Sequence, residues 1–131
     1  MLLDSNILII AATRSHEHHV AVREFLRERD GLYVSAITKP ELLGWAGATP
    51  ADLALRSAIY ASTRSLAVGD AVLDRAASLR RRRQGMKTPD AIVAATALLY
   101  DLALVTRNVR DFAWIEELVV VDPAAPKGPI S

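Results

Sequence analysis

Four carboxylates stand at points where this sequence favours the end of a strand or the start of a helix. Asp4 directly follows a short hydrophobic strand, and Glu41 opens a helix after the second strand. Asp90 opens an alanine-rich helix, and Asp111 comes shortly after the strand that follows it. Strand ends and helix starts share one edge of a parallel α/β sheet, and Asp90 joins them if its helix runs antiparallel to the next strand. We therefore expect all four acids to converge.

Carboxylates that converge in this way need positive charge, because their mutual repulsion raises the pKa of at least one of them. The helix starts at Glu41 and Asp90 supply part of that charge, and bound divalent cations would supply the rest. Mg²⁺ and Mn²⁺ prefer oxygen ligands and retain several waters. One or two such ions can activate a water and clamp a phosphodiester. The four acids therefore indicate metal-dependent hydrolysis of phosphodiesters.

A purely structural explanation exists for some of these acids. An acidic residue in the first turn of a helix commonly serves as a cap, and this explanation suits Glu41 and Asp90 when each is taken singly. Asp4 is harder to explain structurally, because an acid inside an apolar opening segment is costly when it is buried without a partner. The chemical interpretation depends on the four acids taken together.

The elements that must position these acids follow from hydrophobic spacing and from helix-start signals. Pro40, Pro50 and Pro89 mark three helix starts, because proline is well tolerated in the first helical turn. Short apolar strands that alternate with helices indicate an α/β fold with a short, mainly parallel central sheet flanked by helices. Strands are expected at 2–3, 32–34, 65–68, 103–105 and 118–121, and helices over 16–29, from 38, from about 50, over 70–83 and over 88–101.

Length and composition fit one small domain. The chain has 131 residues, of which 51% are hydrophobic, and its net charge of +1 gives no strong pull toward nucleic acid or membrane. The absence of cysteine excludes disulfides, thiolate zinc sites and cysteine nucleophiles. Three of the six prolines lie in the last nine residues. We expect a single domain over 1–122 and a proline-rich C-terminal tail over 123–131.

We expect a cytoplasmic protein without a membrane segment. The apolar start, Met1–Ile10, contains Asp4 and has no basic residue before that acid, which argues against a signal peptide. The apolar run at 91–100 is interrupted by Thr96. It is also shorter than the roughly 20 residues that a membrane-spanning helix needs.

Four segments resemble the motifs of PIN-domain ribonucleases, and most closely those of the VapC toxins of bacterial toxin–antitoxin pairs. The opening Met1–Asn6 is similar to the family's first strand, which ends in an Asp-Ser/Thr-Asn/Ser signature. The other three segments are Ser35–Leu42, Asp90–Ala97 and Leu104–Phe112. They follow one another in the family's order from residue 1 to about 112, and together they are more specific than any one alone.

The resemblance implies a PIN-like three-layer sandwich and a metal-dependent endoribonuclease with one or two Mg²⁺ or Mn²⁺ ions in its site. Some relatives carry an acid at the position of Asn108, so whether Asp111 or Asn108 dominates the fourth position stays open. The implied catalytic and metal-binding residues are Asp4, Glu41, Asp90 and Asp111, and the implied supporting polar residues are Ser5, Asn6, Thr106 and Asn108.

The resemblance also implies partners. They are an RNA substrate, with transfer RNA as a family-level guess, a second copy of the chain in a homodimer, and a cognate antitoxin that blocks the site from a groove among the early helices. Leu42, Leu43 and Trp45 are candidates for lining that groove. For any one of the three, an ordinary core residue is the better explanation.

Four arginines are candidates for contacting RNA, because the guanidinium fork fits phosphate well. They are Arg82, Arg83, Arg107 and Arg110. The alternative for the first two is a basic helix end that complements the helix dipole. Trp45 and Trp114 are expected in the core rather than as stacking platforms for bases.

Other functions fit less well. A phosphatase of the haloacid dehalogenase type needs an acid where Asn6 stands, and a dinucleotide-binding domain needs a glycine-rich turn after the first strand. The segment His16–His19 lacks zincin spacing, because Val20 stands where the second histidine is required. One alternative stays open: a catalytically silent PIN-like module that binds RNA or a protein.

Overall fold

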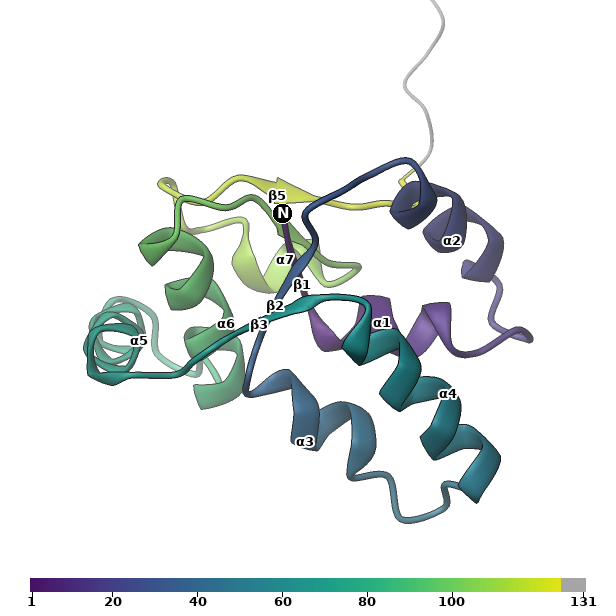
Figure 1. The fold of residues 1–131 in the computed structure, drawn as a ribbon. Helices are drawn as coiled ribbons and strands as arrows, with labels where there is room; N and C mark the ends of the chain where they lie inside the picture. The colour runs from purple at the N-terminus through teal and green to yellow at the C-terminus, as the bar shows by residue number, and fades with distance from the viewer. Residues whose placement is uncertain (126–131) are drawn as a thin grey trace, which may run out of the picture.

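The short first strand lies at the centre of a five-stranded sheet in the computed structural model, which describes residues 1–125. The sheet order is β3-β2-β1-β4-β5, and every pair of neighbouring strands is parallel (Figure 1). The prediction of a short, mainly parallel sheet is therefore confirmed. The strands are β1 (Leu2–Leu3), β2 (Tyr33–Ser35), β3 (Arg64–Leu66), β4 (Leu104–Val105) and β5 (Val120–Val121).

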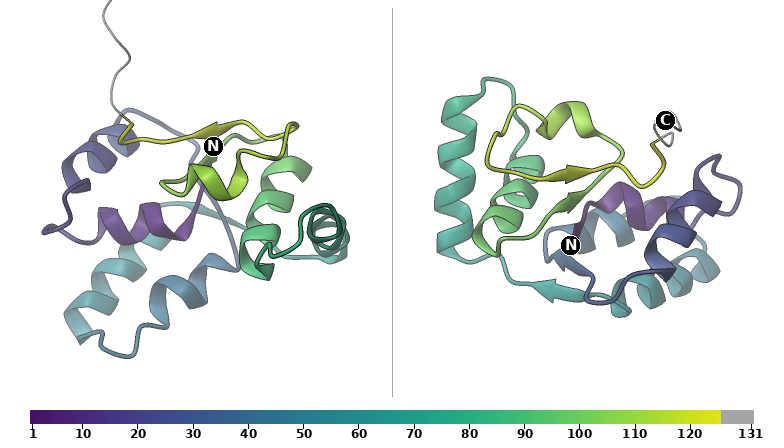
Figure 2. Two further views of the ribbon diagram at one scale, coloured as in Figure 1. Left: turned by 180° about the vertical axis from the view of Figure 1, so that it is seen from behind. Right: turned by 90° about the horizontal axis from the view of Figure 1, so that it is seen from above.

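Helices cover both faces of this sheet, so the molecule has three layers (Figure 2). Successive side chains of a strand point to opposite faces; accordingly Leu2 belongs to one buried hydrophobic cluster and Leu3 to another. On the Leu3 side lie α1 (Ser5–Ala11), α2 (His19–Arg27), α3 (Thr38–Leu43) and α4 (Pro50–Ala61), and on the Leu2 side lie α5 (Asp70–Arg82), α6 (Thr88–Leu99) and α7 (Val109–Phe112).

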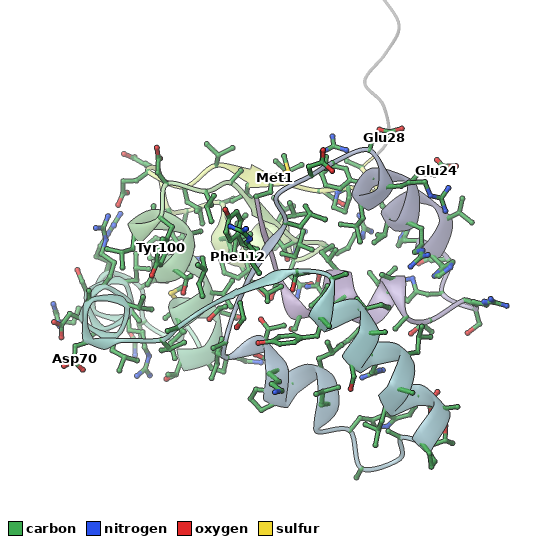
Figure 3. The ribbon with its side chains drawn as sticks, in the orientation of Figure 1. Met1, Glu24, Glu28, Asp70, Tyr100 and Phe112 are labelled. Carbon is green, nitrogen blue, oxygen red and sulfur yellow. The ribbon has the colours of Figure 1, made fainter. Side chains whose placement is uncertain are left out.

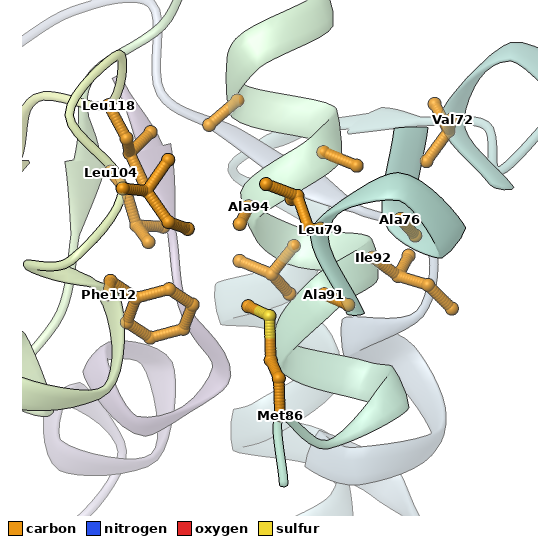
Figure 4. Close-up of a cluster of buried hydrophobic side chains, with 14 of the residues drawn as sticks. Val72, Ala76, Leu79, Met86, Ala91, Ile92, Ala94, Leu104, Phe112 and Leu118 are labelled. Carbon is orange, nitrogen blue, oxygen red and sulfur yellow. The ribbon is translucent and has the colours of Figure 1, made fainter. Parts of the chain in front are cut away.

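Helix α6 forms the centre of the Leu2-side layer. Its residues Ala91–Ala97 are all buried, as expected for a helix that is apolar nearly all round. Figure 4 shows α6 packed between α5 on one side and Leu104 and Phe112 on the other. The chain then turns back sharply into β4, with the Leu102 N–H bonded to the Ala97 carbonyl. This turn makes α6 antiparallel to β4, so the start of α6 lies at the carboxyl edge of the sheet.

Two helices were not predicted. Helix α1 contains Ile7, Leu8 and Ile10, whose apolar and largely β-branched side chains favour a strand over a helix. Burial of these side chains and the Asp4 cap outweigh that local preference. Helix α7 is a single turn of four residues, too short to show a period. The helix expected over 16–29 is also shorter than predicted, because residues 13–18 form turns and α2 begins at His19.

The described chain continues for a few residues after β5. Ala124 donates its backbone N–H to Oδ1 of Asp122, which forms a turn directly after β5. The rest of the predicted tail, residues 126–131, lies outside the described residues. Within residues 1–125, no helix is both long enough and apolar enough to cross a membrane.

Candidate active site

Asp4 is the buried centre of the polar cluster at the carboxyl edge of the sheet. It follows β1 and is only 5% exposed. One of its oxygens, Oδ1, accepts the Ser5 backbone N–H at 2.8 Å and so caps α1. The other, Oδ2, accepts the Thr106 hydroxyl at 2.8 Å and the Asn6 amide at 3.1 Å. Three neutral donors therefore hold one carboxylate in a single orientation.

The loop after β4 is tied to the loop after β1 by Thr106 and Asn6. The Asn6 amide donates to the Thr106 hydroxyl oxygen at 3.2 Å, and that oxygen also accepts the Asn108 backbone N–H at 3.0 Å. The Asn6 carbonyl oxygen accepts the Arg107 backbone N–H at 3.3 Å. Two segments about 100 residues apart in sequence are thereby fixed against each other around Asp4.

Glu41 joins this cluster through Ser5. The Ser5 hydroxyl donates to Oε2 of Glu41 at 3.0 Å. Glu41 lies in the first turn of α3, yet its carboxylate makes no capping bond to that helix in the described part of the chain. The structural explanation of Glu41 as a helix cap is therefore not what the structure shows.

Asp90 and Asp111 complete the set of four acids. Asp90 lies half-buried in the first turn of α6, and Asp111 lies exposed in α7. Neither carboxylate takes part in a hydrogen bond or ion pair within residues 1–125, and Asp90 does not cap its helix. Other acids, such as Glu24, Glu28 and Asp70, lie at the outside of the molecule (Figure 3).

The pKa values of Asp4 and Asp90, the two more buried acids, are raised by their surroundings. Burial raises the pKa of Asp4 above its ordinary value, the charge of Glu41 adds to the rise, and the hydrogen bonds from Thr106, Ser5 and Asn6 oppose it. Burial also raises the pKa of Asp90, and the charges of Asp4 and Asp111 raise it further, with only Lys87 acting against them. The charge of Glu41 thus acts on Asp4, and the charges of Asp4 and Asp111 act on Asp90, so like charge accumulates along this edge.

The donor chemistry of this cluster fits a hard divalent cation. Across residues 1–125, no three histidine, aspartate or glutamate side chains are drawn together closely enough to enclose a metal ion. Mg²⁺ keeps several waters, however, and needs only one or two direct carboxylates. An ionised carboxylate offers about four lone-pair sites, of which Asp4 uses three. The four acids therefore offer only oxygen ligands, and the Asp4 carboxylate keeps about one lone-pair site for a cation.

The four arginines proposed for RNA contact fall into two pairs. Arg82 forms a two-pronged ion pair with Glu117 at 2.8 and 3.1 Å. The Arg107 guanidinium is bound to Asp122 and lies 3.0 Å from Nε2 of His18. Arg83 and Arg110 instead line a pocket beside Asp90. The first pair serves the structure of the protein itself, while the second pair is placed toward the acids.

Three residues at or near the site were not predicted from the sequence. Asp122 holds Arg107, Lys87 stands beside Asp90, and Trp114 lines the same pocket. The position of Lys87 directly before the Thr88-Pro89-Asp90 helix start is a signal that sequence alone could have used. The Asp122–Arg107 contact joins residues 15 apart after two intervening elements, and no local pattern indicates it.

The residues suggested for a groove differ among themselves. Leu42 is fully buried and belongs to the core, whereas Leu43 is partly buried. Trp45 is 49% exposed, so its expected place in the core is wrong. The Arg56 guanidinium lies 4.8 Å from the centre of its ring, and this buried arginine donates to the Leu42 carbonyl. Trp45 therefore covers a buried cation at the surface instead of filling the interior.

Comparisons with known proteins agree with this architecture. A chain from a toxin–antitoxin complex from Klebsiella pneumoniae is 31% identical over 93% of this chain and 96% of that chain, with a TM-score of 0.74. A chain of FitAcB from Neisseria gonorrhoeae is 25% identical over the same shares, with a TM-score of 0.77. VapC20 from Mycobacterium tuberculosis, a sarcin-ricin loop cleaving toxin, is 10% identical over 87% of this chain and 94% of that chain, and its TM-score of 0.72 shows a likeness of fold.

The family itself is shown by a match over most of the sequence. A search of curated proteins finds no match, but the family model of the PIN domain matches residues 1–118. This match includes all four motifs on which the resemblance rested. The chain therefore belongs to the PIN domain family.

Proposed function

We propose that this protein is the toxin of a toxin–antitoxin pair and acts as a metal-dependent endoribonuclease. The observation that carries the proposal is the placement of Asp4, Glu41, Asp90 and Asp111 at one edge of the sheet, where none of the four carboxylates forms an ion pair within residues 1–125. Membership of the PIN family and the 31% identical chain from a toxin–antitoxin complex support the assignment.

The residues have separate tasks in this proposal. Asp4 and Asp90 would hold Mg²⁺ or Mn²⁺, as one or two ions, with Glu41 and Asp111 completing the oxygen ligands. When bound, such an ion activates water and neutralises charge on a phosphodiester. The chain's own contribution is to orient the ligands: Thr106 and Asn6 fix Asp4, and Ser5 fixes Glu41. Preorganisation of this kind avoids reorganisation during the reaction.

The reaction proposed is attack of water on the phosphorus of an RNA phosphodiester. The P–O bond to the 3′ oxygen breaks, which leaves a 5′-phosphate and a 3′-hydroxyl. A transfer RNA is the proposed substrate by family resemblance, and a cytoplasmic location goes with that substrate. The proposed partners are a second copy of this chain and a cognate antitoxin.

A direct test is incubation of the purified, antitoxin-free protein with total RNA in the presence of Mg²⁺, Mn²⁺ or a chelator. We expect discrete cuts with either metal and none with the chelator. Mapping of the product ends should give 5′-phosphates. Binding of RNA without any cleavage by the folded protein would replace this proposal with the alternative of a catalytically silent PIN-like module.

A further inference from the structure

A pocket opens next to Asp90 and Asp111, outside the polar network around Asp4. Its volume is about 370 Å³, within the range of sites that hold small ligands. One wall is the loop between α5 and α6, residues 83–87, and the other is α7 with the residues that follow it. The side chains that matter below are Arg83, Lys87, Arg110 and Trp114.

The pocket carries three basic side chains, of which Lys87 acts on the charge of Asp90 and Arg83 lies over the Trp114 ring. Arg83, Lys87 and Arg110 form no ion pair with any carboxylate of residues 1–125. The neighbouring Arg82 contrasts with them, because Glu117 occupies both prongs of its guanidinium. Guanidinium and ammonium groups without a protein anion are suited to bind phosphate. Although Asp90 and Asp111 also line the pocket, these three basic groups outnumber them and can bind an anionic ligand directly beside the candidate metal ligands.

Trp114 is partly buried and packs against the hydrophobic core, as expected, and it also gives this pocket an aromatic surface. Its Nε1 donates to the Asp111 carbonyl at 3.1 Å, which fixes the indole beside one of the four acids. The Arg82 and Arg83 guanidinium groups lie 5.4 and 5.7 Å from the ring centre. An aromatic ring beside unpaired basic groups is the combination that binds single-stranded nucleic acid, because every base has a face that can stack.

Both walls of the pocket are anchored in the same hydrophobic cluster. Met86 enters it from the α5–α6 loop and Phe112 enters it from α7 (Figure 4). The loop is held further by Arg80, whose Nε donates to the Met86 carbonyl at 3.1 Å. Gly85 has a φ of +89°, a conformation that glycine adopts without strain. The pocket is thus preformed, which lowers the entropic cost of binding.

We propose that this pocket is the subsite for one unpaired nucleotide next to the phosphodiester that is cut. Arg83, Lys87 and Arg110 hold its phosphate, and its base stacks on Trp114. The base must be free of a duplex to do so, since bases inside an RNA helix are already stacked and paired. The proposal rests on the proposed ribonuclease function and goes further, because it assigns Lys87 and Trp114, beside Arg83 and Arg110, to the binding of one nucleotide and excludes Arg82 and Arg107 from phosphate binding.

The two tryptophans of the chain make the test direct. Replacement of the half-exposed Trp45 by phenylalanine leaves Trp114 as the sole indole fluorophore. The full-length Trp45→Phe protein is titrated with a short single-stranded RNA, and separately with a duplex of the same composition, in chelator so that no cleavage occurs. We expect the single strand to quench Trp114 fluorescence and to bind about tenfold more tightly than the duplex.

Variants identify the groups that bind. Arg83→Ala and Arg110→Ala should each weaken single-strand binding several-fold and reduce its dependence on salt. Arg75→Ala, which removes an exposed arginine from helix α5, is the control and should change binding less than twofold. If Trp45→Phe does not fold, the NMR signal of the Trp114 indole N–H in the unaltered chain reports the same contact.

The outcomes separate this proposal from the proposed function. Trp114 quenching by single-stranded RNA in a protein that never cuts RNA would support the subsite and contradict the nuclease. Metal-dependent cleavage in a protein whose Trp114 does not respond, or responds equally to duplex and single strand, would overturn the subsite alone. A stronger response to poly-glutamate than to RNA would also overturn it, by assigning the pocket to an acidic peptide.

Discussion

Ser5 binds Glu41 through a side-chain hydrogen bond of 3.0 Å between its Oγ and Oε2 of the glutamate. The same residue donates its backbone N–H to Asp4 at 2.8 Å. One serine therefore bridges two carboxylates that come from different parts of the chain, the end of β1 and the first turn of α3. Because the charge of Glu41 raises the pKa of Asp4, this bridge holds two mutually repelling groups in place.

Ser5→Ala should remove the bridge and leave the backbone contact to Asp4 intact. We expect the rate of RNA cleavage to fall about tenfold, with the loss in kcat and not in KM, because second contacts of metal-binding groups orient them. Stability should change by about 1 kcal/mol or less. Ser62→Ala, which removes an exposed hydroxyl at the end of α4, is the control. Equal rates for both variants would show that the bridge does not position Glu41.

Thr106→Val should be more damaging, because the Thr106 hydroxyl is fully buried and contacts Asp4, Asn6 and the Asn108 backbone. Loss of a buried hydrogen-bond partner costs about 1–3 kcal/mol of stability. We expect that loss in urea unfolding, together with a 10- to 100-fold loss of activity.

The matched control for this variant is Thr96→Val, in α6. Its hydroxyl is also fully buried, but it donates only to the Ile92 carbonyl of its own helix. This control should lose stability without losing metal-dependent activity. A similar loss of activity in both variants would mean that Thr106 acts only through general stability.

Removal of the Asp90 charge should stabilise the folded protein at neutral pH. The folded pKa of Asp90 lies above its ordinary value of 3.8, so ionisation disfavours the folded state once the pH exceeds that value. The cost is absent below pH 3.8, grows as the pH rises toward the folded pKa, and is complete above it. Solvent screening of this half-buried group limits the gain in Asp90→Asn to about 1 kcal/mol or less.

Urea unfolding of the chain and of Asp90→Asn at pH 7 and at pH 4, without divalent metal, measures this effect. The gain should be present at pH 7 and shrink at pH 4. Added Mg²⁺ should then stabilise the unaltered chain more than the variant, because a ligand that binds only the folded state raises stability. A variant that is less stable than the unaltered chain at pH 7 would contradict the crowding of charge around Asp90.

Asp122→Asn should have the opposite effect. Burial acts to raise the pKa of Asp122, but the hydrogen bonds from Arg107 and from the Ala124 N–H outweigh it, so the pKa is lowered. The charged form therefore stabilises the fold above pH 3.8, and this contribution is lost as the pH falls through the folded pKa. We expect a loss of about 1–2 kcal/mol at pH 7, which disappears at acidic pH, and little change in Asp74→Asn, an exposed acid of α5.

The sequence predicted those parts of the fold and site that are marked by residues next to them in the chain. Asp4, Glu41, Asp90 and Asp111 could be placed because strand ends and helix starts are marked by local residues, and a parallel sheet brings such points to one edge. Helices α3, α4 and α6 begin where their prolines indicated. The family motifs cover the same positions, and the PIN match over residues 1–118 confirms the family resemblance.

The sequence did not predict the features that depend on contacts between residues far apart in the chain. Helix α1 exists because Ile7 and Leu8 are buried against the sheet layer, which overrides the strand preference of the segment. Arg82 and Arg107 look alike in the sequence to Arg83 and Arg110, yet only the first two find carboxylates, at positions 117 and 122. Which arginines are left to bind a substrate could not be read from local patterns.

The central claim is that carboxylates at the sheet edge cut RNA with the help of a divalent metal, and the sharpest test compares Asp90→Asn with Asp70→Asn. Both acids lie in the first turn of a helix, α6 and α5 respectively, but only Asp90 lies near Asp4 and Asp111. Cleavage rates of the same RNA are measured in Mn²⁺ for both variants and the unaltered chain. We predict a loss of at least about 100-fold for Asp90→Asn and less than twofold for Asp70→Asn. Cleavage by folded Asp90→Asn at the unaltered rate would contradict the account.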